Sequence, residues 1–234
     1  MRQSFSCPSR QEVYHALQAR SCRPERSRSR CRIVRARAEG FNAFFGGVHA
    51  AGTTHNALMC FADGSYAELL ALTGRPPISG AGVDFAWLID SRPEEIVAFA
   101  LVARDIDAEA AALRVHGVPV GLVSAGQRQR SDGQLLQRRL AWIELALPIM
   151  LIQDVTPRRL RVPDDPQVIR QPNGVAGISE LVLPPALENS AHFTTLFGPP
   201  QPDSGGARRY TLDGSHLIVM PGVAKPSIHY AKTT

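Results

Sequence analysis

The sequence has no uninterrupted apolar run of the roughly 18 residues that a membrane-spanning helix needs. Its longest apolar stretch, residues 140–152, is broken by Glu144 and Pro148. The N-terminal segment also has no apolar stretch of the kind found in a secretory signal peptide. These absences exclude a helical membrane protein, and we expect a cytoplasmic protein that makes no membrane contact.

Several common functional motifs are missing as well. The four cysteines are Cys7, Cys22, Cys31 and Cys60, and no two are spaced as a C-x-x-C pair, which argues against a zinc site and favours reduced thiols. There is no P-loop, no dinucleotide-binding fingerprint, no G-x-S-x-G and no H-E-x-x-H. Kinase, dehydrogenase, serine hydrolase and zinc protease functions therefore have no support.

The positive charge is concentrated at the N-terminus. The chain carries a formal net charge of +5, but ten arginines and three glutamates in residues 1–40 sum to +7, which leaves −2 for the other residues. A basic arm attracts nucleic acid or anionic lipid, while an unstructured tail accounts for the same composition. We favour the tail, and we restrict any nucleic-acid contact to this arm.

Changes in composition divide the 234 residues into three parts. We expect a basic extension over residues 1–37, largely disordered or in short helices, then a main domain over residues 38–220 and a flexible tail over residues 221–234. Within the extension, Ser9 and Glu12 fit a capping box and predict a short helix over residues 9–21. A second basic helix is predicted over residues 33–39, ended by Gly40.

Three Asp-Gly pairs, at residues 63–64, 132–133 and 213–214, predict hairpins in the main domain. The order strand, helix, strand, hairpin is clearest over residues 96–155 and is partly visible over residues 33–73 and 178–220. We therefore predict an α+β fold of repeated βαβββ modules at about residues 38–75, 94–156 and, in part, 174–220. Their curved, mostly antiparallel sheets would surround a cleft. No apolar strand precedes Phe41, so the first strand of the first module is expected to be missing.

Three segments carry a family resemblance. Residues 46–72, GGVHAAGTTHNALMCFADGSYAELLAL, contain a Gly-Gly-x-His turn, a Thr-His-Asn strand and a strand with Glu68. The Arg-rich hairpin GQRQRSDGQLLQRRLA and the strand LPIMLIQDVTP follow in order. Over about residues 38–190 the chain resembles glyoxalase-like domains of the vicinal oxygen chelate superfamily. The resemblance implies a small-molecule ligand and, for an enzyme, lyase, isomerase or dioxygenase chemistry at a divalent metal ion.

The metal ligands that the resemblance implies are incomplete in this chain. Only Glu68 stands where a ligand is expected, because Ala98 and Phe99 occupy the first strand of the second module and Gln153 replaces the expected glutamate. A carboxylate among apolar neighbours must be paired, metal-bound or protonated. We predict Glu68 as the ligand of any divalent ion or as a general base; an ion pair with Arg138 is the alternative.

His49 and His55 complete the predicted catalytic set with Glu68. A two-residue turn at Asp63-Gly64 would direct His55 and Glu68 to one face of the hairpin and Asn56 to the other. The first two would then lie about 13 Å apart along the strands, so a shared metal ion is not expected. His55 lines the cleft or is a structural histidine, and His49, in a glycine-rich loop, contacts substrate or is exposed.

Arg128, Arg130 and Arg138 lie on one predicted hairpin. Guanidinium groups bind carboxylate or phosphate in a bidentate manner, so this group predicts an acidic ligand. A solvated edge strand that resists aggregation explains the same pattern. We add Asn56 and Trp142 to the predicted substrate-binding residues, although tryptophan in a strand is more often part of a core.

Two functions remain open from the sequence. One is a glyoxalase-like protein that binds or transforms a small anionic or carbonyl-bearing metabolite in a cleft between modules, with a divalent ion as the optional cofactor. The other is a metal-free binding or sequestering protein of the same fold without catalysis, in which Arg128 and Arg138 hold the ligand. Because modules of this kind often complete a cleft with a partner, we also expect a homodimer.

Overall fold

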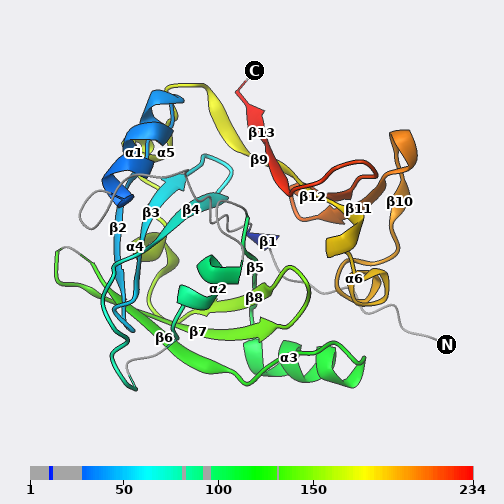
Figure 1. Cartoon of the computed structure of the whole chain (residues 1–234), viewed down its shortest axis with the longest axis horizontal. Coiled ribbons are helices and arrows are strands. Elements are labelled where there is room, and N and C mark those ends of the chain that lie inside the picture. Colours follow the sequence, from blue (N-terminus) through cyan, green and yellow to red (C-terminus); the bar gives the residue numbers. More distant parts are fainter. Residues whose placement is uncertain (1–10, 13–27, 81–82, 92–95, 131, 234) are drawn as a thin grey trace.

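A computed structural model describes residues 11–12, 28–80, 83–91, 96–130 and 132–233 of the chain. These residues form two sheets (Figure 1). The larger has the strand order β1-β5-β8-β7-β6-β2-β3-β4, and the smaller has the order β10-β11-β12-β9-β13. Only the pairs β5–β8 and β9–β12 are parallel among the described strand pairs, so the α+β fold is mostly antiparallel, as the sequence predicts. None of the described helices is long and apolar enough to cross a membrane.

One complete βαβββ module lies in the larger sheet. It consists of β5 (Phe99–Val102), α3 (Ile106–Val115), β6 (Ser124–Gln129), β7 (Leu135–Ile143) and β8 (Ile149–Asp154), and its spatial order is β5-β8-β7-β6. The Asp105 carboxylate caps α3 by accepting from the Ala108 N–H at 3.1 Å. Asp132 accepts from the Gln134 N–H and closes the β6–β7 hairpin that the Asp-Gly pair predicts.

The first module is shorter. It comprises α1 (Arg28–Ala38), β2 (Phe44–His49), β3 (Thr54–Cys60) and β4 (Tyr66–Leu72), and no described strand lies beyond β4. Residues 13–27, which precede α1, lie outside the described residues, so the missing first strand stays a prediction. The modules join where β2 pairs with β6, through Val48 opposite Gln129 and His49 opposite Arg128.

The third module forms the smaller sheet. It contains β9 (Val175–Leu183), a 3-10 turn at Pro185–Leu187, α6 (Ser190–Phe197), β10 (Gln201–Pro202), a second 3-10 turn at Ser204–Gly206, β11 (Arg208–Leu212) and β12 (Ser215–Val219). Its order β9-β12-β11-β10 repeats that of the second module. Residues 227–232 form β13 (Ser227–Lys232), which pairs with β9. The expectation of a flexible tail is wrong for these residues, because Ile228 and Tyr230 pack against the main core.

The N-terminal expectations also need correction. Helix α1 begins at Arg28, five residues before the helix start predicted at residue 33. Gln11–Glu12 form the short strand β1, which pairs with β5, rather than part of a helix. The rest of the predicted helix over residues 9–21 lies outside the described residues.

Three short helices cover the concave face of the large sheet (Figure 1). They are α2 (Ala86–Ser91), α4 (Arg158–Arg161) and α5 (Pro166–Ile169). A buried cluster joins strand residues Leu58, Leu70 and Met150 to Leu88 of α2 and to Val162, which follows α4. The concave face is thus largely filled by the protein's own side chains rather than open to a ligand.

Candidate functional site

The β3–β4 hairpin has a different register from the one expected. Cys60 pairs with Tyr66 across a five-residue connection, so Glu68 lies opposite Leu58 and His55 lies opposite Ala71. Asp63 accepts from both the N–H and the hydroxyl of Ser65 and so widens the turn. The one-residue change turns His55 to the face opposite Glu68, so the expectation that both share a face is wrong.

The glycine-rich motif builds the seam between the first two modules. A β-bulge interrupts the pairing of β2 with β3 between Phe45 and Gly47, and Gly47 has a φ of +135°, which favours glycine. The Arg128 side chain passes this bulge, and its Nη1 donates to Asn56 Oδ1 at 2.9 Å. Arg128 and Asn56, both predicted to bind substrate, thus bind each other in a buried position.

His49 lies at the same seam and is held neutral. Its Nδ1 is 2.9 Å from the Thr54 hydroxyl, and its ring packs against Phe85 with centroids 4.6 Å apart. Burial lowers the pKa of His49 well below its ordinary value, and the nearby charges of Arg138 and Arg128 lower it further. A neutral imidazole beside two guanidinium groups is suited to a hydrogen bond with an anionic or carbonyl-bearing molecule.

The depressed pKa of His49 predicts a pH dependence of stability. Below the unfolded-state value of about 6.5, the unfolded chain binds a proton at His49 that the folded chain does not bind. The free energy of unfolding should therefore fall as the pH falls from 7 to 5, by at most about 1.4 kcal/mol per pH unit from this residue. Urea titrations at several pH values measure it. His49→Gln should flatten this slope, and an unchanged slope would contradict the assignment.

A second buried polar side chain, Arg161, spans the concave face from β8 to β4. Arg161 is 4% exposed and binds Asp154 of β8 in a bidentate manner, with Nε to Oδ1 at 2.6 Å and Nη2 to Oδ2 at 2.7 Å. Its Nη1 donates to the Tyr66 hydroxyl of β4, and the guanidinium lies 5.4 Å from the centroid of the Tyr66 ring. Arg161 thereby connects the last strands of the first two modules. Arg138 is also buried and lies directly opposite Asp154 in the β7–β8 register.

The residues around Glu68 do not fit the divalent ion that the resemblance implies. Glu68 is half-buried on the concave face, opposite Leu58. The neighbouring Cys60 is a poor ligand, because burial raises the pKa of its thiol to about 12 and keeps it protonated. Among the described residues, no group of three or more His, Cys, Asp and Glu side chains is placed to hold a metal ion.

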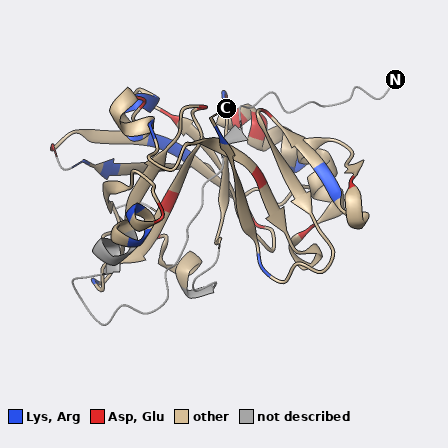
Figure 2. Cartoon of the chain, turned by 90° about the horizontal axis from the view of Figure 1, so that it is seen from above, with Lys and Arg blue, Asp and Glu red and all other residues tan. Residues whose placement is uncertain are grey.

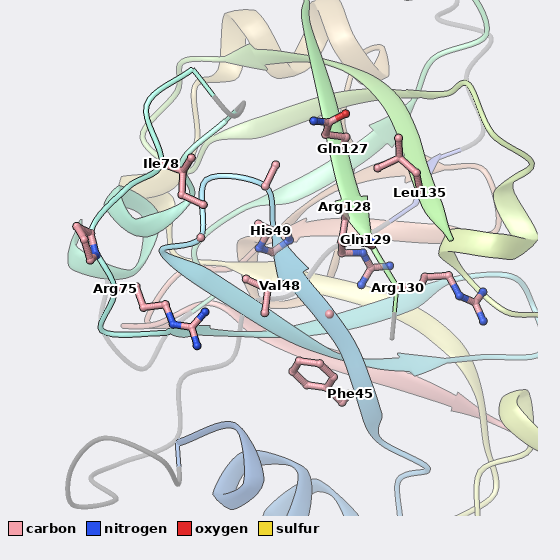
Figure 3. A pocket seen from close by; sticks show the side chains of 14 residues that line it. Phe45, Val48, His49, Arg75, Ile78, Gln127, Arg128, Gln129, Arg130 and Leu135 are labelled. Atoms are coloured by element: carbon pink, nitrogen blue, oxygen red, sulfur yellow. The ribbon is translucent and has the colours of Figure 1, made fainter. Parts of the chain in front are cut away.

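A groove with a volume of about 540 Å³ lies along the seam where β2 meets β6 (Figure 3). We call it the seam groove. Arg75, Arg128, Arg130 and His49 line it together with apolar residues and two glutamines, and none of its lining residues is acidic. Arg75 is exposed and Arg130 is half-buried, whereas His49 and Arg128 are only 4% and 2% exposed. Arg130 donates to the Leu160 carbonyl at 2.8 Å and pairs with Asp132 at 3.1 Å.

The other predicted site residues do not line this groove. His55 is on the outer face, with its ring centroid 6.1 Å from that of Phe45. Trp142 packs beneath α2, with its ring centroid 5.5 Å from that of Trp87 and 6.1 Å from that of Phe85. The seam groove thus brings together His49, Arg128 and Arg130 from the prediction, but not Glu68, His55, Asn56, Arg138 or Trp142.

Sequence reasoning missed two residues of consequence. Arg75 lies in a proline-containing segment without periodicity, where no pattern assigns a role. Asp154 follows Gln153, which we expected in the ligand position. Because side chains alternate between the two faces of a strand, Asp154 points to the concave face. Gln153 instead donates to the Arg104 carbonyl near the start of α3. Alternation along the strand LPIMLIQD, which puts Met150, Ile152 and Asp154 on one face, was the sequence signal that could have identified Asp154.

Acidic and basic residues are interspersed over both sheets in the described part of the chain (Figure 2). Charge alone therefore does not single out one face as a binding surface. The features that distinguish this molecule are its repeated βαβββ modules and the cation-lined groove at the junction of two of them. They define the chain as an α+β protein built from βαβββ modules that pair edge to edge.

The chain belongs to the glyoxalase-like domain family, whose model matches residues 31–194. Among solved structures, it is similar to a hypothetical protein from Staphylococcus aureus, with a TM-score of 0.69, 17% identity and coverage of 96% of this chain and 92% of that one. A hypothetical protein from Bacillus halodurans matches with a TM-score of 0.41 and 11% identity over 64% of this chain and 97% of that one. The first likeness supports the fold alone. No curated protein matches the chain.

Proposed function

We propose that this glyoxalase-like protein binds a small anionic or carbonyl-bearing metabolite in the seam groove, without a resident metal ion. The observation that carries the proposal is the lining of the groove, in which three arginines and a histidine occur with no acidic residue. Guanidinium groups bind carboxylates and phosphates through paired, charge-assisted hydrogen bonds. The buried Cys60 thiol accords with a reducing, cytoplasmic location, which we retain as part of the proposal.

The polar groups in and behind the groove have distinct parts in this proposal. Arg130 is held by the Leu160 carbonyl, so its guanidinium is already oriented when a ligand arrives. His49, neutral through burial, offers a hydrogen bond without adding charge. The buried Arg128 and Arg138 contribute positive charge, which favours an anion near His49. Arg128 keeps its hydrogen bond to Asn56.

Isothermal titration calorimetry with pyruvate and with inorganic phosphate tests the proposal. We expect binding by the wild type that weakens at higher salt, and an affinity about tenfold lower in Arg130→Ala, a loss of ~1.4 kcal/mol. Arg130→Lys should lie between the two, because it keeps the charge but loses the planar fork. Arg139→Ala is the matched control, since Arg139 is paired with Asp107 outside the groove. Absence of binding of both anions, or equal affinity in Arg130→Ala, would refute the proposal.

A second candidate is catalysis of the lyase, isomerase or dioxygenase type, with Glu68 as general base. It is favoured by the position of Glu68, a half-buried carboxylate between apolar residues of the concave face. Elemental analysis of the purified protein and of Glu68→Gln separates the two candidates. A stoichiometric metal ion that the substitution removes would contradict metal-free binding, whereas unchanged anion binding in Glu68→Gln would support it.

A further inference from the structure

Exposed apolar side chains gather in the seam groove. The described residues include nine large apolar side chains that are exposed, and four of them line this groove. They are Phe45 (48% exposed), Val48 (37%), Ile78 (59%) and Leu135 (47%). Single exposed apolar residues need no explanation, but a group around one hollow is characteristic of a binding surface.

These four residues come from three separate segments. Phe45 and Val48 lie on β2, Leu135 begins β7, and Ile78 belongs to the loop after β4. Hydrogen bonds fix that loop, because the Ile78 N–H donates to the Ala51 carbonyl at 2.9 Å and the Thr73 hydroxyl donates to the Gly52 carbonyl at 2.6 Å. The apolar surface is therefore formed before any ligand binds, which reduces the entropy cost of binding.

Positive charge stands at the borders of this apolar surface (Figure 3). Arg75 is exposed beside Ile78, and no ion pair joins it to another residue within the described ranges. Arg130 stands near Leu135, with its guanidinium held at the Leu160 carbonyl and Asp132. A ligand that fills the groove would therefore contact apolar side chains and an arginine. None of the lining residues is a carboxylate that would repel an anionic group.

We infer that the ligand is an amphiphilic monocarboxylate, with its apolar chain on Phe45, Val48 and Leu135 and its carboxylate at Arg75. The inference rests on the proposed function and narrows its ligand from small anions to those with an apolar body. A volume of about 540 Å³ lies within the range of about 300–1,000 Å³ typical of small-molecule sites. The hollow shape and the cationic border favour this ligand over a second copy of the chain.

The test is a chain-length series of butanoate, hexanoate and octanoate, measured by calorimetry below their micelle concentrations. Each buried methylene should tighten binding by about fourfold in the wild type. Leu135→Ser and Phe45→Ser should reduce this gain, while Arg75→Ala should weaken all three acids by a similar factor and leave the gain per methylene intact. Leu122→Ser is the control, since Leu122 is 90% exposed and does not line the groove.

The outcomes separate this inference from the proposed function. Equal affinity for butanoate and octanoate, with pyruvate binding that depends on Arg130, would overturn the amphiphile and leave the anion site standing. Absence of binding of every anion would overturn both. Sedimentation velocity supplies a further check: we expect Phe45→Ser to leave the oligomeric state unchanged. A dimer that this substitution dissociates would overturn the inference, because a second copy would then cover the groove.

Discussion

Replacing Arg161 with methionine is expected to lower the free energy of unfolding by about 3–5 kcal/mol. Arg161 is 4% exposed and its partner Asp154 is 13% exposed, so the substitution leaves a carboxylate nearly out of contact with water and without its bidentate partner. The Tyr66 hydroxyl loses its bond to the same guanidinium. Urea denaturation followed by circular dichroism at neutral pH measures the change.

The position of Arg161 explains why this effect should be large. Asp154 belongs to the last strand of the second module and Tyr66 to the last strand of the first, so one side chain joins the two halves of the curved sheet. The main-chain carbonyl of Arg161 lies 3.5 Å from Nη2 of Arg128, near the seam. Removing the guanidinium should thus loosen the concave face and the wall of the seam groove together.

Two controls separate burial from charge. Arg139→Met breaks a similar pair with Asp107, but both partners are well exposed, so its stability should be nearly unchanged. The double substitution Arg161→Met with Asp154→Leu should recover much of the lost stability, because an apolar pair can replace a buried ion pair of similar volume. Equal losses in Arg161→Met and Arg139→Met would show that burial of the pair contributes nothing.

The modular architecture could be predicted because its signals are local. Three hairpins have an Asp-Gly pair at the bend, and Asp105 and Gly117 mark the two ends of α3 in the sequence itself. The partners of the strands are not local. The sequence did not indicate that β2 and β6 join two modules, or that α2 and α4 fill the concave face, because these contacts depend on segments distant along the chain.

The candidate site was only partly predictable for a related reason. A one-residue change in the β3–β4 register turned His55 away from Glu68, and no sequence pattern fixed that register. His49, Arg128 and Arg130 could be named as candidates because histidine and clustered arginine carry chemistry at any position. Arg75 and the exposed apolar side chains come together in the groove only through contacts between distant segments, which sequence reasoning could not supply.

The Gly-Gly pair that carries the family resemblance now has a physical explanation. A Cβ atom placed on Gly46 would lie 2.3 Å from Asn56 Oδ1 and 2.6 Å from Arg128 Nη1. Both neighbours are buried and bonded to each other, so neither can move without breaking the Arg128–Asn56 hydrogen bond. Gly46 is outside the left-handed region of φ, so its requirement is for space and not for backbone freedom. The motif therefore follows from the passage of an arginine between two modules.

Gly46→Ala should accordingly destabilise the chain by about 3 kcal/mol, from overpacking and from the loss of a buried bond to a charged group. Gly121→Ala is a matched control, because Gly121 is also half-buried and outside the left-handed region, but its nearest neighbours would lie 3.5 Å from the added carbon. Thermal and urea denaturation of both variants measure the difference. Gly46→Ala combined with Asn56→Ala should be less destabilised than the sum of the two single variants, because the amide that the new methyl group displaces is already gone. Equal stability of Gly46→Ala and Gly121→Ala would mean that Arg128 does not cross the seam at this glycine.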